Sequence, residues 1–189
     1  MRGVVHKVAI KPGNNNTAML RVGTVPLFAQ PGDCRQRSLN KAIRHVRRMY
    51  SPANADATRT HLNSALAGPV IAKAVHPAAL DMIAASGITP RRNACVIELL
   101  FTIPPNFAME ERAFFAWCLA FAIAHFGAQN IVSADVHRDE AQPHMHVLIM
   151  PILGGKIRGA YWIGSLLNRD TGGKKFKGYE IQTAFARVS

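Results

Sequence analysis

The chain has 189 residues, the length of one domain with a substantial hydrophobic core. Its 23 Lys and Arg residues outnumber its 11 Asp and Glu residues, and the net charge of +12 favours a polyanionic partner, nucleic acid before an anionic membrane. Three cysteines at unrelated spacings favour neither a disulfide framework nor a zinc knuckle. No apolar stretch reaches the roughly 18 residues that a membrane span needs, and no signal peptide precedes the domain, so we expect a cytoplasmic protein.

The first part of the chain predicts two strands followed by a basic helix. Val4 to Ile10 and Ala18 to Phe28 are β-like runs separated by a turn-forming Pro-Gly-Asn segment. Ser38 is the expected N-cap of a helix from Leu39 to Met49, which Pro52 ends. The polar face of this helix carries Lys41, Arg44, His45 and Arg48, and its apolar stripe consists of Leu39, Ile43, Val46 and Tyr50.

The second part predicts helices alternating with strands. A short helix is expected from Pro77 to Ala85, and Asn93 to Ile103 has the pattern of a central strand. Met109 to Phe126 is apolar nearly all round and predicts a buried helix, closed by the glycine that follows. Asn130 to Val136 and Lys156 to Ile163 are further expected strands. This order predicts an α+β fold, a mainly antiparallel central sheet with helices packed on it.

A histidine-rich segment from His137 to His146 holds the strongest chemical pattern. Residues i and i+2 of a strand share a face, so His144 and His146 point the same way. Pro143 suits the start of that strand, because it cannot donate to the ladder. A hairpin would place His137 opposite His144, and three imidazoles would then converge on one point. Such an arrangement is typical of a catalytic metal site with open coordination positions.

A metal held by three neutral imidazoles keeps its full charge and can stabilise the transition state of phosphoryl transfer. Together with the basic helix face, this favours a reaction on nucleic acid. A rival arrangement is a site of two histidines and one carboxylate for iron, with Asp139 or Glu140 as the third ligand. Glu98 on the central strand is a weaker site candidate, with a solvent-facing edge charge as its alternative.

Three segments resemble motifs of the Mob/Pre (MobV) relaxases, plasmid mobilisation and recombination enzymes of the HUH endonuclease superfamily. The segments run from His45 to Arg48 (His-Val-Arg-Arg), from Arg59 to Leu66 (Arg-Thr-His-Leu-Asn-Ser-Ala-Leu) and from His137 to His146. The third contains Asp-Glu followed by Pro-His-Met-His, which is similar to the third family motif. Two positions differ, because the family usually has Thr where Gln142 stands and tends to have Asn where Val46 stands.

The resemblance implies a relaxase-like HUH fold and assigns roles to the motif residues. His45 is expected to attack the DNA backbone, forming a covalent 5′-phosphoramidate and releasing a 3′ hydroxyl. Arg48 is expected to hold the scissile phosphate. Glu140 is expected to accept the proton of the nucleophile or to orient a ligand imidazole. Asp139 is expected to orient a metal-ligating imidazole without binding the metal itself. The arginines on either side of His45, namely Arg44, Arg47 and Arg48, are expected to lower its pKa.

His137, His144 and His146 are the expected metal ligands. Mn²⁺ is favoured, because it accepts nitrogen ligands more readily than Mg²⁺ does. Mg²⁺ remains an alternative. The expected partner is single-stranded or hairpin DNA at an origin of transfer, with other transfer-machinery proteins and without membrane contact. The residues expected to contact DNA are Lys41, Arg44, Arg47, Arg59, His61 and Asn63.

Several alternatives stay open at this point. Tyr50 or His61 could replace His45 as the nucleophile. The chain could be a replication initiator of the HUH class with a tyrosine nucleophile, or a non-catalytic nucleic-acid-binding module with a structural metal. Residues 1–189 are interpreted as a single relaxase catalytic domain, the N-terminal part of a longer protein. Residues 168–189 are expected to form a mobile basic tail.

Overall fold

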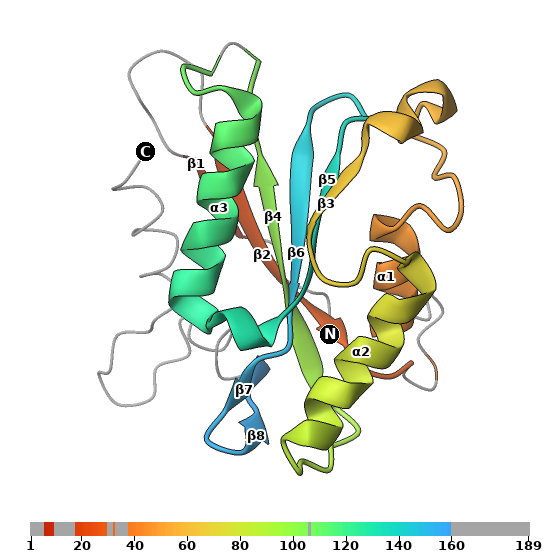
Figure 1. Cartoon of the computed structure of the whole chain (residues 1–189), viewed down its shortest axis with the longest axis vertical. Coiled ribbons are helices and arrows are strands. Elements are labelled where there is room, and N and C mark those ends of the chain that lie inside the picture. Colours follow the sequence, from red (N-terminus) through yellow and green to blue (C-terminus); the bar gives the residue numbers. More distant parts are fainter. Residues whose placement is uncertain (1–5, 10–17, 30–31, 33–37, 106, 160–189) are drawn as a thin grey trace.

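The computed structural model describes residues 6–9, 18–29, 32, 38–105 and 107–159. A six-stranded sheet with the strand order β1-β2-β4-β6-β5-β3 lies between α3 on one face and α1 with α2 on the other (Figure 1). Every neighbouring pair of strands in this sheet is antiparallel, which confirms the predicted α+β class. The strands are β1 His6–Ala9, β2 Met19–Pro26, β3 Ser64–Ala67, β4 Cys95–Thr102, β5 Ile131–His137 and β6 His144–Ile149. The helices are α1 Leu39–Val46, α2 Ala72–Ala85 and α3 Glu111–Phe126, with 3-10 turns η1 Ala57–Leu62 and η2 Ala128–Asn130 and a small hairpin of β7 Ile152–Leu153 and β8 Lys156–Ile157.

Strand alternation divides the interior into two cores. Ile97, Leu99 and Phe101 of β4 pack with α3, whereas Val96 packs with α1 and α2. In β6, Met145, Val147 and Ile149 belong to the α3 core, and Leu148 belongs to the other. His144 and His146 therefore lie on the face that α1 and α2 cover, beyond the point where the apolar packing on that face ends.

Helix α1 begins as predicted, because the Ser38 side chain accepts a hydrogen bond from the amide of Lys41 at 3.3 Å. It ends at Val46, before the predicted Met49. The amide of Arg48 donates to the carbonyl of His45, and that of Met49 donates to the carbonyl of Arg44. These two bonds are the Schellman pattern that stops a helix, and Arg48 stands at its left-handed position with φ 48°.

The other two helices differ from their predicted bounds. Helix α2 starts at Ala72 and contains Pro77 in its interior, so proline does not begin it. Interior proline costs about 3 kcal/mol in an isolated helix, and here the burial of Val75, Ala79 and Ile83 offsets that cost. Helix α3 ends at the predicted glycine but is buried on one side only, because it lies on the surface of the sheet.

Some predictions concern parts of the chain that lie outside the described residues. The strand predicted to run to Ile163 is seen at Lys156–Ile157, and the tail at 168–189 falls outside the described ranges. The turn η1 and the edge strand β3 were not predicted, although both lie in the second motif. Among the described helices, none combines the length and the apolarity needed to cross a membrane.

Candidate metal centre

The histidine hairpin has the register that the sequence predicted. His137, the last residue of β5, pairs directly with His144, the first residue of β6. His146 follows on the same face, opposite Asp135. All three imidazoles are buried, with 0%, 8% and 7% exposed for His137, His144 and His146. The ring centroids lie 4.8 to 5.1 Å apart, so the three predicted ligands form one cluster.

Each of these imidazoles has one nitrogen engaged by an acceptor. His137 Nε2 lies 2.7 Å from the Val46 carbonyl, and His144 Nδ1 lies 2.9 Å from the Gln142 carbonyl. His146 Nδ1 lies 2.8 Å from Oε1 of Glu98. A carbonyl or carboxylate oxygen only accepts, so the engaged nitrogen carries the proton in every case. The second nitrogen of each neutral ring therefore has a free lone pair.

Two of these nitrogens lie close to each other inside the cluster. His137 Nδ1 and His144 Nε2 are 3.3 Å apart, and His146 Nε2 is buried without a hydrogen-bond partner. Lone pairs this close repel unless a cation lies between them. Burial lowers the pKa of His137 to about 2 and also lowers the pKa of His144, which keeps the rings in the neutral form that binds metal. Neutral imidazole nitrogens in a buried cluster are the ligands that suit a divalent transition metal.

The acceptors behind the ligands explain why two departures from the family pattern leave the cluster intact. At Val46 and Gln142 the groups that hold the histidines are main-chain carbonyls, so the side chains there are free to vary. Glu98 is the exception, because its side chain does the holding. It lies on β4, an inner strand between β2 and β6, so it is not an edge charge. A carboxylate that accepts from a ligand imidazole sets its tautomer and orientation.

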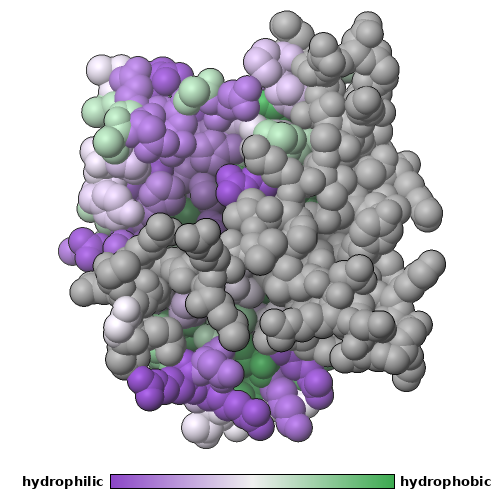
Figure 2. Space-filling view, turned by 180° about the vertical axis from the view of Figure 1, so that it is seen from behind, coloured by the Kyte–Doolittle hydropathy of each residue, from purple (hydrophilic) through white to green (hydrophobic). Residues whose placement is uncertain are grey.

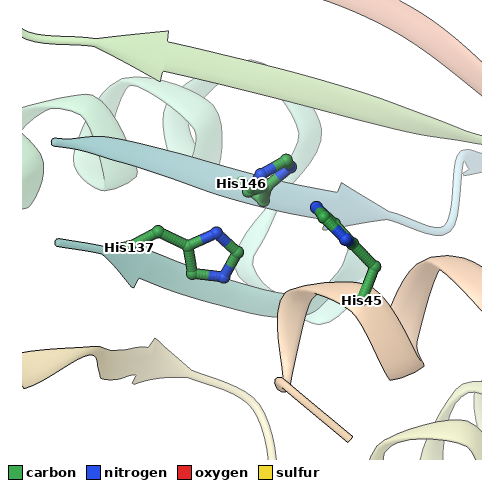
Figure 3. A group of neighbouring side chains, drawn as sticks. All are labelled: His45, His137 and His146. Atoms are coloured by element: carbon green, nitrogen blue, oxygen red, sulfur yellow. The ribbon is translucent and has the colours of Figure 1, made fainter. Parts of the chain in front are cut away.

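His45 approaches the cluster from the last turn of α1 (Figure 3). Its ring centroid lies 5.6 Å from that of His146 and 5.9 Å from that of His137. Its pKa is lowered, first by burial and then by His146 and Arg48, so the ring is neutral at pH 7. Of the three arginines expected to lower this pKa, only Arg48 is among its main causes. Tyr50 is the neighbouring nucleophile candidate, 6.2 Å from His45 between ring centroids and largely exposed.

Arg48 points away from the cluster and into the turn of the histidine hairpin. Its guanidinium donates twice to the Asp139 carboxylate, at 2.8 and 2.7 Å, and once to Glu140 at 2.7 Å. Asp139 is fully buried and also accepts from Asn63 at 2.7 Å and from Thr60 at 3.2 Å. Arg48 holds the pKa of Asp139 well below its ordinary value. The predicted role of Arg48 on the phosphate is therefore replaced by one of joining α1 to the hairpin.

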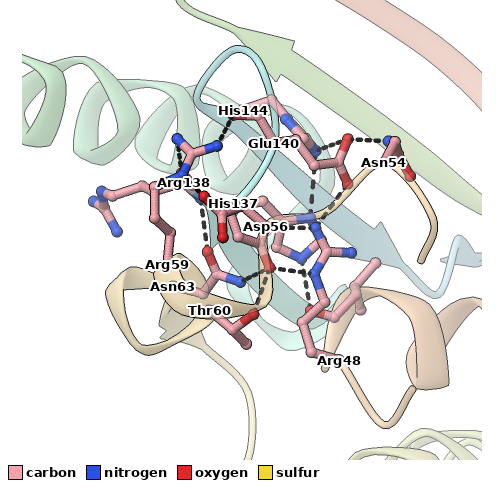
Figure 4. A network of polar contacts seen from close by, with 12 residues as sticks. Arg48, Asn54, Asp56, Arg59, Thr60, Asn63, His137, Arg138, Glu140 and His144 are labelled. Carbon is pink, nitrogen blue, oxygen red and sulfur yellow. Dashed lines mark hydrogen bonds and ion pairs between the residues drawn. The ribbon is translucent and has the colours of Figure 1, made fainter. Parts of the chain in front are cut away.

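The second motif braces the same turn (Figure 4). Asn63 accepts from the amide of Arg138 at 2.7 Å while donating to Asp139. Arg59 donates to the carbonyl of Arg138 at 3.1 Å and pairs with Asp56 at 3.0 Å. These contacts hold the residues between the metal ligands His137 and His144. The Arg59 side chain is still 44% exposed and His61 is exposed, whereas the Asn63 side chain is used in the hydrogen bonds that support the turn.

Only part of the predicted DNA-contacting set lies on the surface. Lys41 and Arg44 are exposed on α1. Arg47 is not available, because its guanidinium forms an ion pair with Asp135 at 2.7 Å, with the two side chains 6% and 5% exposed. From behind, hydrophilic side chains gather at the upper left, at the end of the molecule where η1 lies in Figure 1 (Figure 2). That end can accept a polar, charged ligand.

Glu140 lies close enough to complete an alternative ligand group. One oxygen is 4.0 Å from His144 Nε2. Two groups of possible ligand atoms lie within 4.8 Å of one another: one from His45, His137 and His146, and one from His137, Glu140 and His144. However, the two carboxylate oxygens are already bonded to Arg48 and, at 2.8 Å, to Asn54. The group of three histidines is less encumbered, so the geometry favours imidazole ligands over two histidines with one carboxylate. In that group His45 stands where the sequence predicted His144.

A groove passes in front of the histidines. Two adjoining cavities of about 300 and 500 Å³ open there, and both are lined by Arg21, His45, Leu100 and His146. The sequence analysis did not identify Arg21 as a site residue, because it lies outside all three motifs. Only its position in a strand distinguishes it. The groove brings the candidate metal, the candidate nucleophile and one further arginine to the same space.

Residues 28–165 match the family of plasmid recombination enzymes called Mob_Pre. The chain belongs to this family. It is 39% identical over 69 residues to a plasmid recombination enzyme of Bacillus thuringiensis, a match covering 33% of this chain and 16% of that protein. It is 36% identical over 75 residues to the type 2 enzyme of Staphylococcus aureus (strain Mu50 / ATCC 700699), covering 36% of this chain and 18% of that protein. The matched segments thus span less than a fifth of these relatives.

The fold of the chain is also similar to that of solved structures. The MobM relaxase domain bound to plasmid pMV158 oriT DNA, in a Mn-bound crystal structure at pH 5.5, superimposes with a TM-score of 0.61 at 24% identity. The match covers 79% of this chain and 83% of that domain. At this identity the similarity shows the fold, and the sheet with helices on both faces is the relaxase-domain architecture expected from the motifs.

Proposed function

We propose that the chain is the nicking and joining domain of a relaxase. It would cleave one strand of DNA at an origin of transfer on a plasmid or mobile element and remain attached to the cut end. The observation that carries this proposal is the buried histidine cluster, in which His137 Nδ1 and His144 Nε2 lie 3.3 Å apart, with a neutral His45 beside it. The family supports it, since the MobM domain is described as bound to oriT DNA with Mn.

His137, His144 and His146 would hold the metal ion. A divalent cation there would neutralise charge on the phosphodiester and stabilise the additional negative charge of the transition state. An all-nitrogen ligand set favours Mn²⁺ over Mg²⁺, which prefers oxygen. The chain itself would orient the three imidazoles in the metal-free protein. The carbonyls of Val46 and Gln142 and the carboxylate of Glu98 each accept a hydrogen bond from one of these rings.

His45 is the proposed nucleophile. Because its pKa is lowered, a ring nitrogen offers a lone pair at pH 7. Attack on phosphorus forms a P–N bond and breaks the bond to the 3′ oxygen, which takes a proton from water and leaves as a hydroxyl. The histidine keeps the 5′ phosphate as a phosphoramidate and passes its remaining ring proton to a nearby carboxylate, for which Glu140 is our candidate. The reverse sequence rejoins the strand without ATP.

The surface of the domain supports a single strand or hairpin of DNA as substrate. Lys41, Arg44, Arg59 and His61 are exposed and remain our candidates for contacts to the backbone. Arg47 and Asn63 are not retained, because both side chains are committed to internal contacts. The charge of +12 supplies the general attraction to nucleic acid.

The test is incubation with supercoiled plasmid carrying the DNA that flanks the coding sequence, in Mn²⁺ or in EDTA. Wild type, His45→Ala and Tyr50→Phe are compared for relaxed circles and for protein that migrates with DNA. We expect Mn²⁺-dependent relaxation that His45→Ala abolishes and Tyr50→Phe retains. Acid treatment identifies the bond independently, because a phosphoramidate hydrolyses in acid whereas a phosphotyrosine linkage survives.

Two other outcomes select the alternatives. Loss of relaxation in Tyr50→Phe alone, with an acid-stable link, would move the nucleophile to the exposed tyrosine beside His45 and agree with an initiator of the tyrosine type. Binding of the DNA by wild type without any relaxation in Mn²⁺ would contradict the enzyme proposal. The metal would then be structural, and its removal would change the thermal stability of the domain.

A further inference from the structure

Arg21 lies in a straight row with the metal centre. It pairs with Leu100 across β2 and β4, and Leu100 pairs with His146 across β4 and β6. Residues in such a row project from the same face of a sheet, so the Arg21 side chain stands on the face that carries His146. The row explains why Arg21 lines both cavities of the groove together with His45 and His146.

The guanidinium of Arg21 has no partner within the described residues. Its Nε is buried and makes no hydrogen bond, and no carboxylate among these residues forms an ion pair with it. By contrast, Arg47, Arg48 and Arg138 are each paired with a carboxylate at 2.7 Å or less. Glu98 acts on Arg21 only through space, because its carboxylate accepts a hydrogen bond from His146.

A buried donor without a partner loses its water and gains nothing in return. Arginine presents a planar fork of donors that matches the two oxygens of a phosphate. The fork lies in the groove beside His45, and the metal ligand His146 shares the groove. The missing partner therefore has the chemistry of a phosphate monoanion in an extended strand.

We infer that Arg21 binds the phosphate that His45 attacks and stabilises its negative charge while the bond from the His45 nitrogen to phosphorus forms and the bond to the 3′ oxygen breaks. This assignment rests on the proposed function. It fills the role that the sequence gave to Arg48, whose donors are used within the fold. Arg21 is then a catalytic residue outside all three motifs.

The experiment uses the shortest oligonucleotide that wild type cleaves in Mn²⁺. Arg21→Gln, Arg21→Lys and the control Arg112→Gln are compared under single-turnover conditions. Arg112 is exposed on α3, on the opposite face of the sheet, and its loss removes the same charge. Removing a donor to the transition-state anion should slow cleavage by Arg21→Gln roughly 100-fold, with partial recovery in Arg21→Lys. Arg112→Gln should cleave at the wild-type rate.

A second arm locates the contact. Affinity is measured in EDTA with the same oligonucleotide and with one carrying a neutral methylphosphonate at the cleaved position. Arg21→Gln should bind the charged strand about tenfold more weakly than wild type does, since it loses a charge-assisted hydrogen bond to the phosphate. With the neutral linkage the two proteins should bind equally. Calorimetric Mn²⁺ affinity should be the same in both, because Arg21 is not a ligand.

The outcomes separate the two proposals. Equal cleavage by wild type and Arg21→Gln would overturn the role of Arg21 and leave the relaxase proposal standing. An affinity difference that persists with the methylphosphonate would also overturn it, placing Arg21 on another part of the strand or on Glu98. If wild type cleaves no DNA in Mn²⁺, the relaxase proposal fails and the assignment of Arg21 fails with it.

Discussion

Arg48 and Asp139 form a two-pronged ion pair, with Nε to Oδ2 at 2.8 Å and Nη2 to Oδ1 at 2.7 Å. The pair joins the end of α1 to the turn between β5 and β6. Because His45 lies just before Arg48 and His137 lies just before Asp139, the pair sets the position of the candidate nucleophile relative to the candidate metal ligands. The pair thereby couples two motifs that are far apart in the sequence.

Breaking this pair should destabilise the fold. In Asp139→Asn the buried guanidinium of Arg48 loses one of its two carboxylate partners and keeps Glu140, and removing one partner of a buried pair costs about 3 kcal/mol. Urea unfolding followed by circular dichroism measures the change. Asp81→Asn, at an exposed position of α2, should stay within about 0.5 kcal/mol of wild type. Equal midpoints for the two variants would mean that the pair does not join these elements.

The left-handed backbone of Arg48 predicts an unusual order of stabilities. With φ at 48°, glycine fits this position without the cost that other residues bear. Both Arg48→Gly and Arg48→Ala lose the ion pair, so comparing them isolates the backbone. The glycine variant should be about 1 kcal/mol more stable than the alanine variant in urea unfolding. A more stable alanine variant would show that the helix continues through residue 48.

Stability should fall with acid in the metal-free protein. Burial lowers the pKa of His137 from 6.5 to about 2, so the unfolded chain binds more protons than the folded chain between these values. The contribution is complete above pH 6.5 and is lost as the pH falls toward 2. The lowered pKa of Asp139 adds loss below its ordinary value near 4. Urea unfolding in EDTA from pH 7.5 to 5 should show the decline, and His137→Asn should flatten it.

Manganese binding should depend on Glu98 as well as on the three histidines. Glu98→Gln removes the carboxylate that orients His146, and such a loss lowers metal affinity about 10- to 100-fold. Isothermal titration calorimetry with Mn²⁺ measures it. His146→Ala should abolish binding at this site, and His76→Gln on α2, away from the cluster, should leave it unchanged. Unaltered affinity in His146→Ala would place the metal elsewhere.

Salt dependence should distinguish an arginine on the α1 face of the sheet from one on the opposite face. If Arg44 contacts a DNA phosphate, Arg44→Gln should reduce the slope of log affinity against log salt by about 0.7 for a single strand. Arg112→Gln removes an equal charge from the other face of the sheet and should leave the slope unchanged. Fluorescence anisotropy with a labelled oligonucleotide at several salt concentrations provides the measurement. An equal decrease in both variants would mean that the attraction is general rather than localised on α1.

The sequence alone determined the features that depend on neighbouring residues. Ser38 capping α1, the antiparallel sheet and the pairing of His137 with His144 all follow from local periodicity and turn chemistry. The family motifs were likewise identified correctly from the sequence, because each lies in a short continuous segment. The bounds of α2 did not, since the packing of Val75 and Ile83 outweighed the local preference of Pro77.

The tertiary structure decided which charges face the groove and which face each other. Arg47 and Arg48 look alike in sequence to Arg44, yet Asp135 and Asp139, distant along the chain, hold the first two inside the fold. Glu98 and Arg21 were placed beside His146 by strand order alone. A charged side chain takes the partner that lowers its desolvation cost, and that partner is set by the packing of the whole sheet. No local pattern in the sequence contains that information.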